Sequence, residues 1–96
     1  MAEPALPADC WRRLFGNDRP VAIEIGPGRG EFLRAAAGTR PEWNFVAVER
    51  SATRTAAIER ALAADGPANA RVIWGDAGCL LPHLPAGSAA AVYIQF

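Results

Sequence analysis

Three acidic residues stand at similar intervals along the chain, each at or just after the end of an apolar run. Glu24, Glu49 and Asp76 are separated by 25 and then 27 residues. Carboxylates accept hydrogen bonds from hydroxyl and amino groups, and they attract cations. The first acid also precedes the turn GPGRG, whose glycines let the backbone approach a ligand closely. The pattern indicates a binding site for a small polar ligand, assembled from separate parts of the chain.

The segments around these acids alternate between strand-like and helix-like patterns. Short apolar runs bounded by glycine or proline predict strands, and segments with apolar residues at helical spacing predict helices. We expect strands at residues 21–25, 44–48, 71–74 and 89–96, and helices at 9–15, 30–37, 52–64 and, as one short turn, 78–83. Such alternation is typical of right-handed βαβ units, so we predict an α/β fold with a parallel sheet and flanking helices.

The helix boundaries carry signals of their own. Asp9 and Ser51 are expected to cap the helices at 9–15 and 52–64, because their side chains can accept from first-turn N–H groups. Gly38 is expected to follow the last residue of the helix at 30–37. The side chains of that helix expected to point inward are those of Phe32, Leu33 and Ala36.

The glycine turn favours a cationic ligand over a phosphate. Gly26 and Gly28 fit the start of the dinucleotide pattern G-x-G-x-x-G, but Glu31 occupies the position of its third glycine, and no G-K-[ST] follows. A phosphate here would face Glu24 and Glu31 in a chain without lysine. At about 4 Å such repulsion costs about 1 kcal/mol in water and about 4 kcal/mol at an effective dielectric constant near 20. S-adenosylmethionine carries an ammonium and a sulfonium group and no phosphate, so it suits the turn.

The remaining acids match the other parts of that ligand. At the carboxyl end of its strand, Glu49 can accept from both ribose hydroxyls, and Asp76 can accept from the adenine amino group. The backbone amide of Ala77 can meet a ring nitrogen. Each acid also has a purely structural interpretation. Glu24 can be a surface charge on a strand, Glu31 can stabilise a helix N-terminus, and Asp76 can be a helix N-cap.

Composition limits the class of protein. The chain has 96 residues, enough for one domain or part of one, and its ten arginines balance ten acids. A self-sufficient nucleic-acid-binding domain usually has a basic excess, which this chain lacks. No apolar run approaches the length of a membrane span, and no signal peptide is evident, so we expect a cytoplasmic protein. Cys10, Cys79 and His83 do not form a metal-binding pattern.

Several short motifs together resemble the class I S-adenosylmethionine-dependent methyltransferases, and more narrowly the bacterial tRNA (guanine-N7)-methyltransferase family. The resemblance covers about residues 9–96 and lies in the first half of that family's domain. The motifs are FGN at residues 15–17, EIG at 24–26 with Gly28 and GEFL at 30–33, Pro41, VER at 48–50, GDA at 75–77, and VYI at 92–94 with Phe96. The glycine motif alone would indicate only the methyltransferase superfamily. The other motifs favour the tRNA (guanine-N7)-methyltransferase family within it.

The resemblance implies a Rossmann-like methyltransferase fold, here incomplete with about four strands, and S-adenosylmethionine as the cofactor. It implies a parent enzyme that methylates N7 of a guanine in tRNA. The residues expected to bind the cofactor are Glu24, Gly26, Gly28, Gly30, Glu49, Arg50, Asp76 and Ala77. Two residues depart from the family pattern: Pro27 replaces an aromatic or small residue, and Gln95 replaces an asparagine.

The family's proline-aspartate-proline-tryptophan motif and its tRNA-binding segments are expected just after Phe96. Residues 9–96 are therefore interpreted as the cofactor-binding half of the domain, and residues 1–8, which are rich in alanine and proline, as a loose N-terminus. No catalytic residue is expected in this chain, which alone should be inactive. The strand at 89–96 should then form an open apolar edge that promotes self-association.

Other functions stay open on the sequence. The chain can be a non-catalytic module that binds S-adenosylmethionine, or part of a methyltransferase of the same superfamily with another substrate. A dehydrogenase is a weaker alternative, because the third dinucleotide glycine is missing. Six arginines could contact phosphates, although solvated surface charge is the simpler interpretation; they are Arg12, Arg13, Arg19, Arg29, Arg34 and Arg40.

Overall fold

A computed structural model describes residues 9–26, 28–85 and 87–94. The expectations for residues 1–8, Pro27, Gln95 and Phe96 lie outside these described residues. The strands are β1 (Val21–Ile25), β2 (Asn44–Glu49), β3 (Ala70–Trp74) and β4 (Ala91–Ile94). The helices are α1 (Cys10–Phe15), α2 (Glu31–Thr39), α3 (Ala52–Asp65) and α4 (Ala77–Leu80), and the 3₁₀ helix η1 (Leu81–His83) follows α4.

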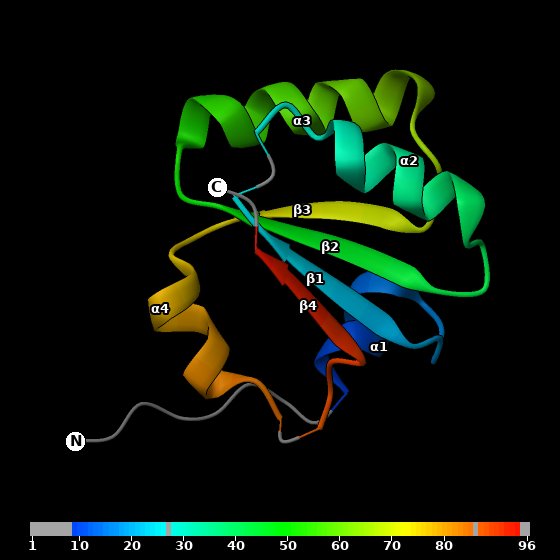
Figure 1. Ribbon diagram of the computed structural model, residues 1–96, viewed down its shortest axis with the longest axis vertical. Helices are drawn as coiled ribbons and strands as arrows, with labels where there is room; N and C mark the ends of the chain where they lie inside the picture. Colours follow the sequence, from blue (N-terminus) through cyan, green and yellow to red (C-terminus); the bar gives the residue numbers. More distant parts are fainter. Residues whose placement is uncertain (1–8, 27, 86, 95–96) are drawn as a thin grey trace.

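The four strands form one parallel sheet in the order β3-β2-β1-β4 (Figure 1). In the register, Glu24 of β1 lies between Ala47 of β2 and Tyr93 of β4, and Glu49 pairs with Trp74 of β3. The predicted α/β class and parallel sheet are confirmed. The carboxyl ends of β1, β2 and β3 therefore meet at one edge of the sheet, where the three acids stand.

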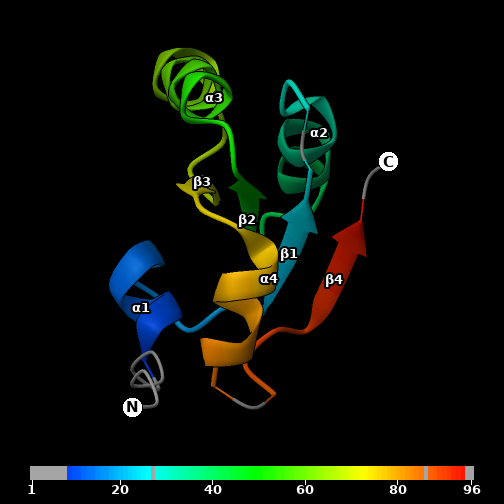
Figure 2. The ribbon, with the colours of Figure 1, turned by 90° about the vertical axis from the view of Figure 1, so that its left-hand side faces the viewer.

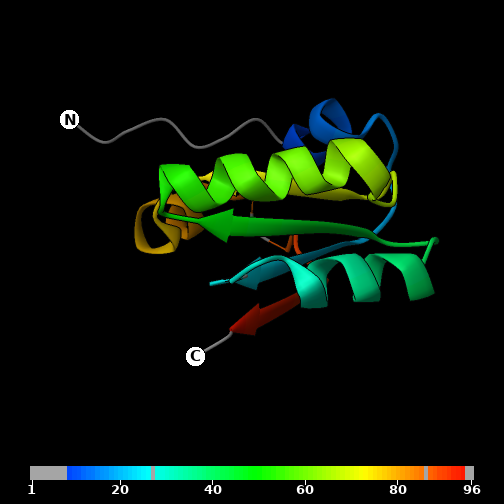
Figure 3. The same ribbon diagram turned by 90° about the horizontal axis from the view of Figure 1, so that it is seen from above.

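Helices cover the sheet on both faces, and the pleat divides the core into two clusters. Helices α2 and α3 cover one face of the sheet (Figure 3). Their side chains pack there against Ala22 of β1. Helices α1 and α4 lie on the opposite face (Figure 2). Side chains of α1, α4 and η1 pack there against Val21 and Ile23, which alternate with Ala22 along β1. This alternation explains why the strands read as nearly continuous apolar runs, as expected for a sheet buried on both sides.

Two of the predicted helix boundaries differ from the structure. Asp9 stands at the N-cap position of α1, but its side chain accepts no capping hydrogen bond from a backbone N–H of the helix and instead pairs with the side chain of Arg13 at 3.0 Å. Gly38 lies inside α2, which continues to Thr39, so its prediction as the residue after the helix was wrong. By contrast Ser51 caps α3 as predicted, its hydroxyl accepting from the N–H of Arg54 at 3.2 Å.

The inward face of α2 was predicted only in part. Leu33 is buried and Ala36 packs at the margin of the core. Phe32 is 40% exposed, and its ring packs against that of Tyr93 with 5.4 Å between the centroids. The prediction for Phe32 was therefore wrong, because this side chain leans toward the sheet edge and not into the core.

Strand β4 forms an open edge of the sheet, as predicted. Val92, Tyr93 and Ile94 are 48%, 42% and 57% exposed, so apolar side chains face solvent on a strand whose outer backbone groups are not paired with another strand of the sheet. Among the described residues, no helix is both long and apolar enough to cross a membrane.

Candidate functional site

The turn after β1 requires glycine for conformational reasons. Gly26, Gly28 and Gly30 have φ values of +72°, +60° and +83°, a region that other L-residues adopt only with strain. The N–H of Gly26 donates to the carbonyl oxygen of Val48 at 3.4 Å, which ties the ends of β1 and β2 together. Gly30 is the N-cap of α2, and a Cβ there would lie 3.4 Å from Ile58 of α3. The turn is thus held against both neighbouring elements.

A pocket of about 310 Å³ opens beside this turn at the carboxyl ends of three strands. Its walls come from the ends of β1, β2 and β3 and from the starts of α3 and α4. The lining residues are Ile25, Gly26, Val48, Glu49, Arg50, Arg54, Gly75, Asp76 and Ala77. This is the edge at which parallel α/β sheets bind their ligands.

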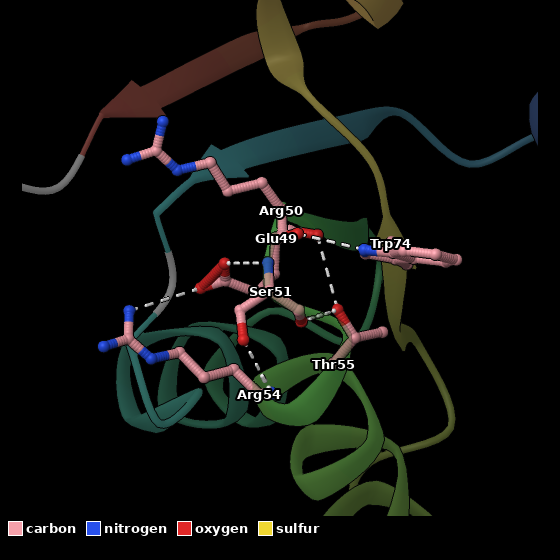
Figure 4. Close-up of polar contacts among 6 residues, drawn as sticks. All are labelled: Glu49, Arg50, Ser51, Arg54, Thr55 and Trp74. Carbon is pink, nitrogen blue, oxygen red and sulfur yellow. Dashed lines mark hydrogen bonds and ion pairs between the residues drawn. The ribbon is translucent and has the colours of Figure 1, made fainter.

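Glu49 is oriented by its own backbone surroundings (Figure 4). The residue is only 4% exposed, and its Oε2 accepts from the N–H of Ser51 at 3.0 Å. Its Oε1 lies 3.9 Å from Nη1 of Arg54, close enough for attraction between charges but too long for a hydrogen bond. Thr55 donates its hydroxyl to the carbonyl oxygen of Glu49 at 3.3 Å. One carboxylate oxygen is therefore fixed, while the other keeps its acceptor capacity at the pocket wall.

Asp76 has the structural role that was considered for it, and it also lines the pocket. Its Oδ1 accepts from the N–H of Gly78 at 2.7 Å, so Asp76 caps α4. The residue is exposed, and within the described residues its Oδ2 has no hydrogen-bond partner. The cap holds the side chain in place and leaves one oxygen for a ligand.

Glu24 occupies an unusual position for a carboxylate. It is 3% exposed, on the sheet face that α2 and α3 cover. Among the described residues, neither of its carboxylate oxygens has a hydrogen-bond partner. Burial raises the pKa of Glu24 to about 7, because the charged form has lost water without gaining a partner. The interpretation of Glu24 as a surface charge was therefore wrong.

Comparison with known proteins agrees with this arrangement. A family model described as "Putative methyltransferase" matches residues 18–96. The chain belongs to this methyltransferase family. Similar proteins include the tRNA (guanine-N(7)-)-methyltransferase of Listeria monocytogenes serotype 4b, 38% identical over 87 residues, which are 90% of this chain and 40% of the relative. The enzyme of the same name from Lactobacillus delbrueckii subsp. bulgaricus is 34% identical over 98% of this chain and 43% of its own length. A third enzyme of this name, from Streptococcus sanguinis, is 32% identical over 94% of this chain and 44% of its own length.

This methyltransferase chain thus spans about 40% of the length of the curated relatives that it matches. Their similarity extends over nearly all of the chain and so includes the glycine turn and the strand ends described above. The family membership agrees with the resemblance expected from the sequence motifs.

The pocket at the strand ends gathers five of the eight residues predicted to bind a cofactor. They are Gly26, Glu49, Arg50, Asp76 and Ala77. Glu24, Gly28 and Gly30 do not line this pocket. Arg50 has an exposed side chain, and its carbonyl oxygen accepts from Nε1 of Trp74 at 2.9 Å (Figure 4).

Arg54 is the charged pocket residue that sequence reasoning missed. It lies three residues after the Ser51 cap, in the first turn of α3, and so beside the strand ends. The cap and the strand end were both predictable, and together they would have indicated this position. Within the part of the chain that the structure describes, no group of three or more metal-ligating side chains is found.

Proposed function

We propose that this chain forms the S-adenosylmethionine-binding part of an enzyme that methylates N7 of a guanine in tRNA. One observation carries the proposal: three strand ends bring Gly26 of the positive-φ glycine turn, an oriented Glu49 and a capped Asp76 to one pocket. The buried and unpartnered Glu24 adds a carboxyl group on β1, two residues before Gly26 of the same turn.

The groups present suit the parts of S-adenosylmethionine. The unpartnered Glu24 carboxyl beside the glycine turn suits the cationic amino-acid end. The free Oε1 of Glu49 suits the ribose hydroxyls, and the free Oδ2 of Asp76 suits the adenine amino group. Ala77 begins α4, where a first-turn N–H has no acceptor within the helix and can meet an adenine nitrogen. When bound, the cofactor supplies an electrophilic methyl group.

The tRNA part of the proposal comes from the relatives. Their printed names specify guanine N7 of tRNA, and N7 is a nucleophilic ring nitrogen. Holding that nitrogen in line with the methyl donor can lower the barrier substantially without an elaborate set of catalytic groups. We propose that the catalytic residues and most tRNA contacts belong to the portion of the relatives' length that this chain does not span, and that the enzyme acts in the cytoplasm.

Isothermal titration of the 96-residue chain with S-adenosylhomocysteine and, separately, with NAD tests the proposed cofactor. We expect S-adenosylhomocysteine to bind, and NAD to bind much more weakly because its pyrophosphate meets the acids of the turn. Binding of NAD without binding of S-adenosylhomocysteine would overturn the proposal.

A further inference from the structure

Glu24 is the one carboxylate of the described chain with both of its oxygens buried and unpartnered. Its neighbours in the sheet are Ala47 on β2 and Tyr93 on β4, and neither donates a hydrogen bond to its carboxyl group. A buried carboxylate without a partner is costly when charged, since nothing replaces the water it has lost. The structure therefore favours the neutral, protonated acid in the free protein.

The surrounding charges do not change this conclusion. No described cation forms an ion pair with Glu24. Arg54 lies against Glu49 instead, at 3.9 Å. The ionisable residues on the elements around Glu24 are Glu49 on β2, Tyr93 on β4, Glu31 and Arg34 on α2, Arg54, Glu59, Arg60 and Asp65 on α3, and Arg29 in the glycine turn. Those of the turn and the two helices are exposed, so water screens their charges.

We propose that ligand binding is coupled to the loss of a proton from Glu24, which is neutral in the free protein and ionised beside the bound ligand's ammonium group. The inference rests on the proposed function, because it takes the ammonium of the cofactor as the incoming cation. An opposite charge within about 4–6 Å favours the charged form of a carboxyl group. The proton leaves the carboxyl oxygen for solvent, and the resulting carboxylate and the ammonium form an ion pair, so charge balances.

Glu24 is suited to this role by its place near the end of β1, just before the turn. Gly26, two residues later, lines the pocket and is tied to Val48 by its N–H. Gly30 ends the turn directly before α2, which covers the same face of the sheet as Glu24. A cation bound at Gly26 therefore has, two residues away along β1, a carboxyl group that can ionise without first losing a hydrogen-bond partner. The coupling would make affinity depend on pH near neutrality.

Titration calorimetry of the full 96-residue chain with S-adenosylhomocysteine tests this coupling. Buffers with different ionisation enthalpies report the number of protons exchanged on binding. We expect release of close to one proton per ligand at pH 6 and almost none at pH 8.5. The affinity should rise about tenfold from pH 6 to pH 8 as the cost of deprotonation disappears.

Two matched controls assign the proton to Glu24 and the ammonium. Glu24→Gln should bind more weakly than the wild-type chain at pH 8, with no proton release and no pH dependence in this range. Adenosine, which lacks the amino-acid end, should bind the wild-type chain without releasing a proton.

The possible failures are distinguishable. Binding of S-adenosylhomocysteine with no proton release and constant affinity would overturn the coupling and leave the proposed function standing. Equal proton release with adenosine, or from Glu24→Gln, would also overturn it. Absence of binding at every pH would overturn the proposed function, and this inference with it.

Discussion

The N–H of Ser51 donates a 3.0 Å hydrogen bond to Oε2 of Glu49, so the residue that caps α3 also orients the acid at the end of β2. The same serine accepts from the N–H of Arg54 through its hydroxyl at 3.2 Å. Helix capping and the arrangement of the pocket wall are therefore linked through one residue. This link explains how an acid that is 4% exposed can still present a free oxygen in a fixed direction.

Replacing Glu49 should weaken cofactor binding. Glu49→Ala removes a charged acceptor for the ribose hydroxyls, each such hydrogen bond being worth roughly 1.5–3 kcal/mol. We expect the dissociation constant for S-adenosylhomocysteine to rise at least tenfold in calorimetry. Glu42→Ala, at an exposed turn position, is the matched control and should leave it unchanged. Equal affinity of the two variants would remove the proposed role of Glu49.

Substitution by alanine should change the stability of the chain in opposite directions at Gly30 and Gly38. Gly30 has a φ of +83° and would place a Cβ 3.4 Å from Ile58, so Gly30→Ala should destabilise the chain by about 1–2 kcal/mol. Gly38 lies in α2 with nothing near its added Cβ, so Gly38→Ala should stabilise by about 0.5–1 kcal/mol. Thermal unfolding measures both changes, at about 4–8 °C per kcal/mol for a domain of this size. A stabilising Gly30→Ala would show that the turn is described wrongly.

The buried Glu24 should impose a pH dependence on stability. Its pKa rises from 4.5 in the unfolded chain to about 7 in the folded chain, so the folded state keeps a proton that the unfolded state loses. Stability from this group is fully present below pH 4.5 and is lost as pH rises to about 7. Glu24→Gln should remove that loss, worth about 3 kcal/mol, and so be more stable than wild type at pH 8. Urea unfolding at pH 5 and pH 8 measures the free energy of unfolding of both proteins. An equal change in that free energy between the two pH values for wild type and Glu24→Gln would contradict the prediction.

The open edge of β4 should make the chain associate with itself. Val92 and Ile94 are exposed apolar residues, and the described strand Ala91–Ile94 carries no charge or proline to block pairing. Sedimentation velocity should show association that rises with concentration and decreases in Val92→Lys. Ala64→Lys, at an exposed position on α3, adds the same charge and should leave association unchanged. A wild-type chain that stays monomeric at high concentration would contradict this prediction.

Much of the fold could be predicted because local patterns and tertiary packing agree along most of the chain. The apolar runs at Val21–Ile25 and Asn44–Glu49 became neighbouring parallel strands, and Ser51 capped the following helix. The alternation of elements also predicted that the strand ends would meet. The position of Gly38 inside α2 could not be predicted, because the helix continues past a residue that usually ends one, and the N–H of Arg40 still donates to the carbonyl oxygen of Ala36 at 3.1 Å.

The residues of the site that stand at strand ends could be predicted from their positions in the sequence. Features that depend on the surrounding side chains and helices were harder to predict. Glu49 and Asp76 reached the pocket as expected from their spacing. The burial of Glu24 depends on α2 and α3 covering its face of the sheet, which no local pattern reports. Arg54 was missed because a lone arginine in a helix usually indicates a solvated surface.

The central claim is that the pocket at the carboxyl ends of β1, β2 and β3 binds the cofactor. Titration of the ¹⁵N-labelled chain with S-adenosylhomocysteine, followed by amide shifts in NMR, tests it most directly. We expect the largest shifts at Gly26, Arg50, Gly75 and Ala77, which line the pocket. Saturable shifts confined to the opposite end of the strands, or no shifts at millimolar ligand, would contradict the account.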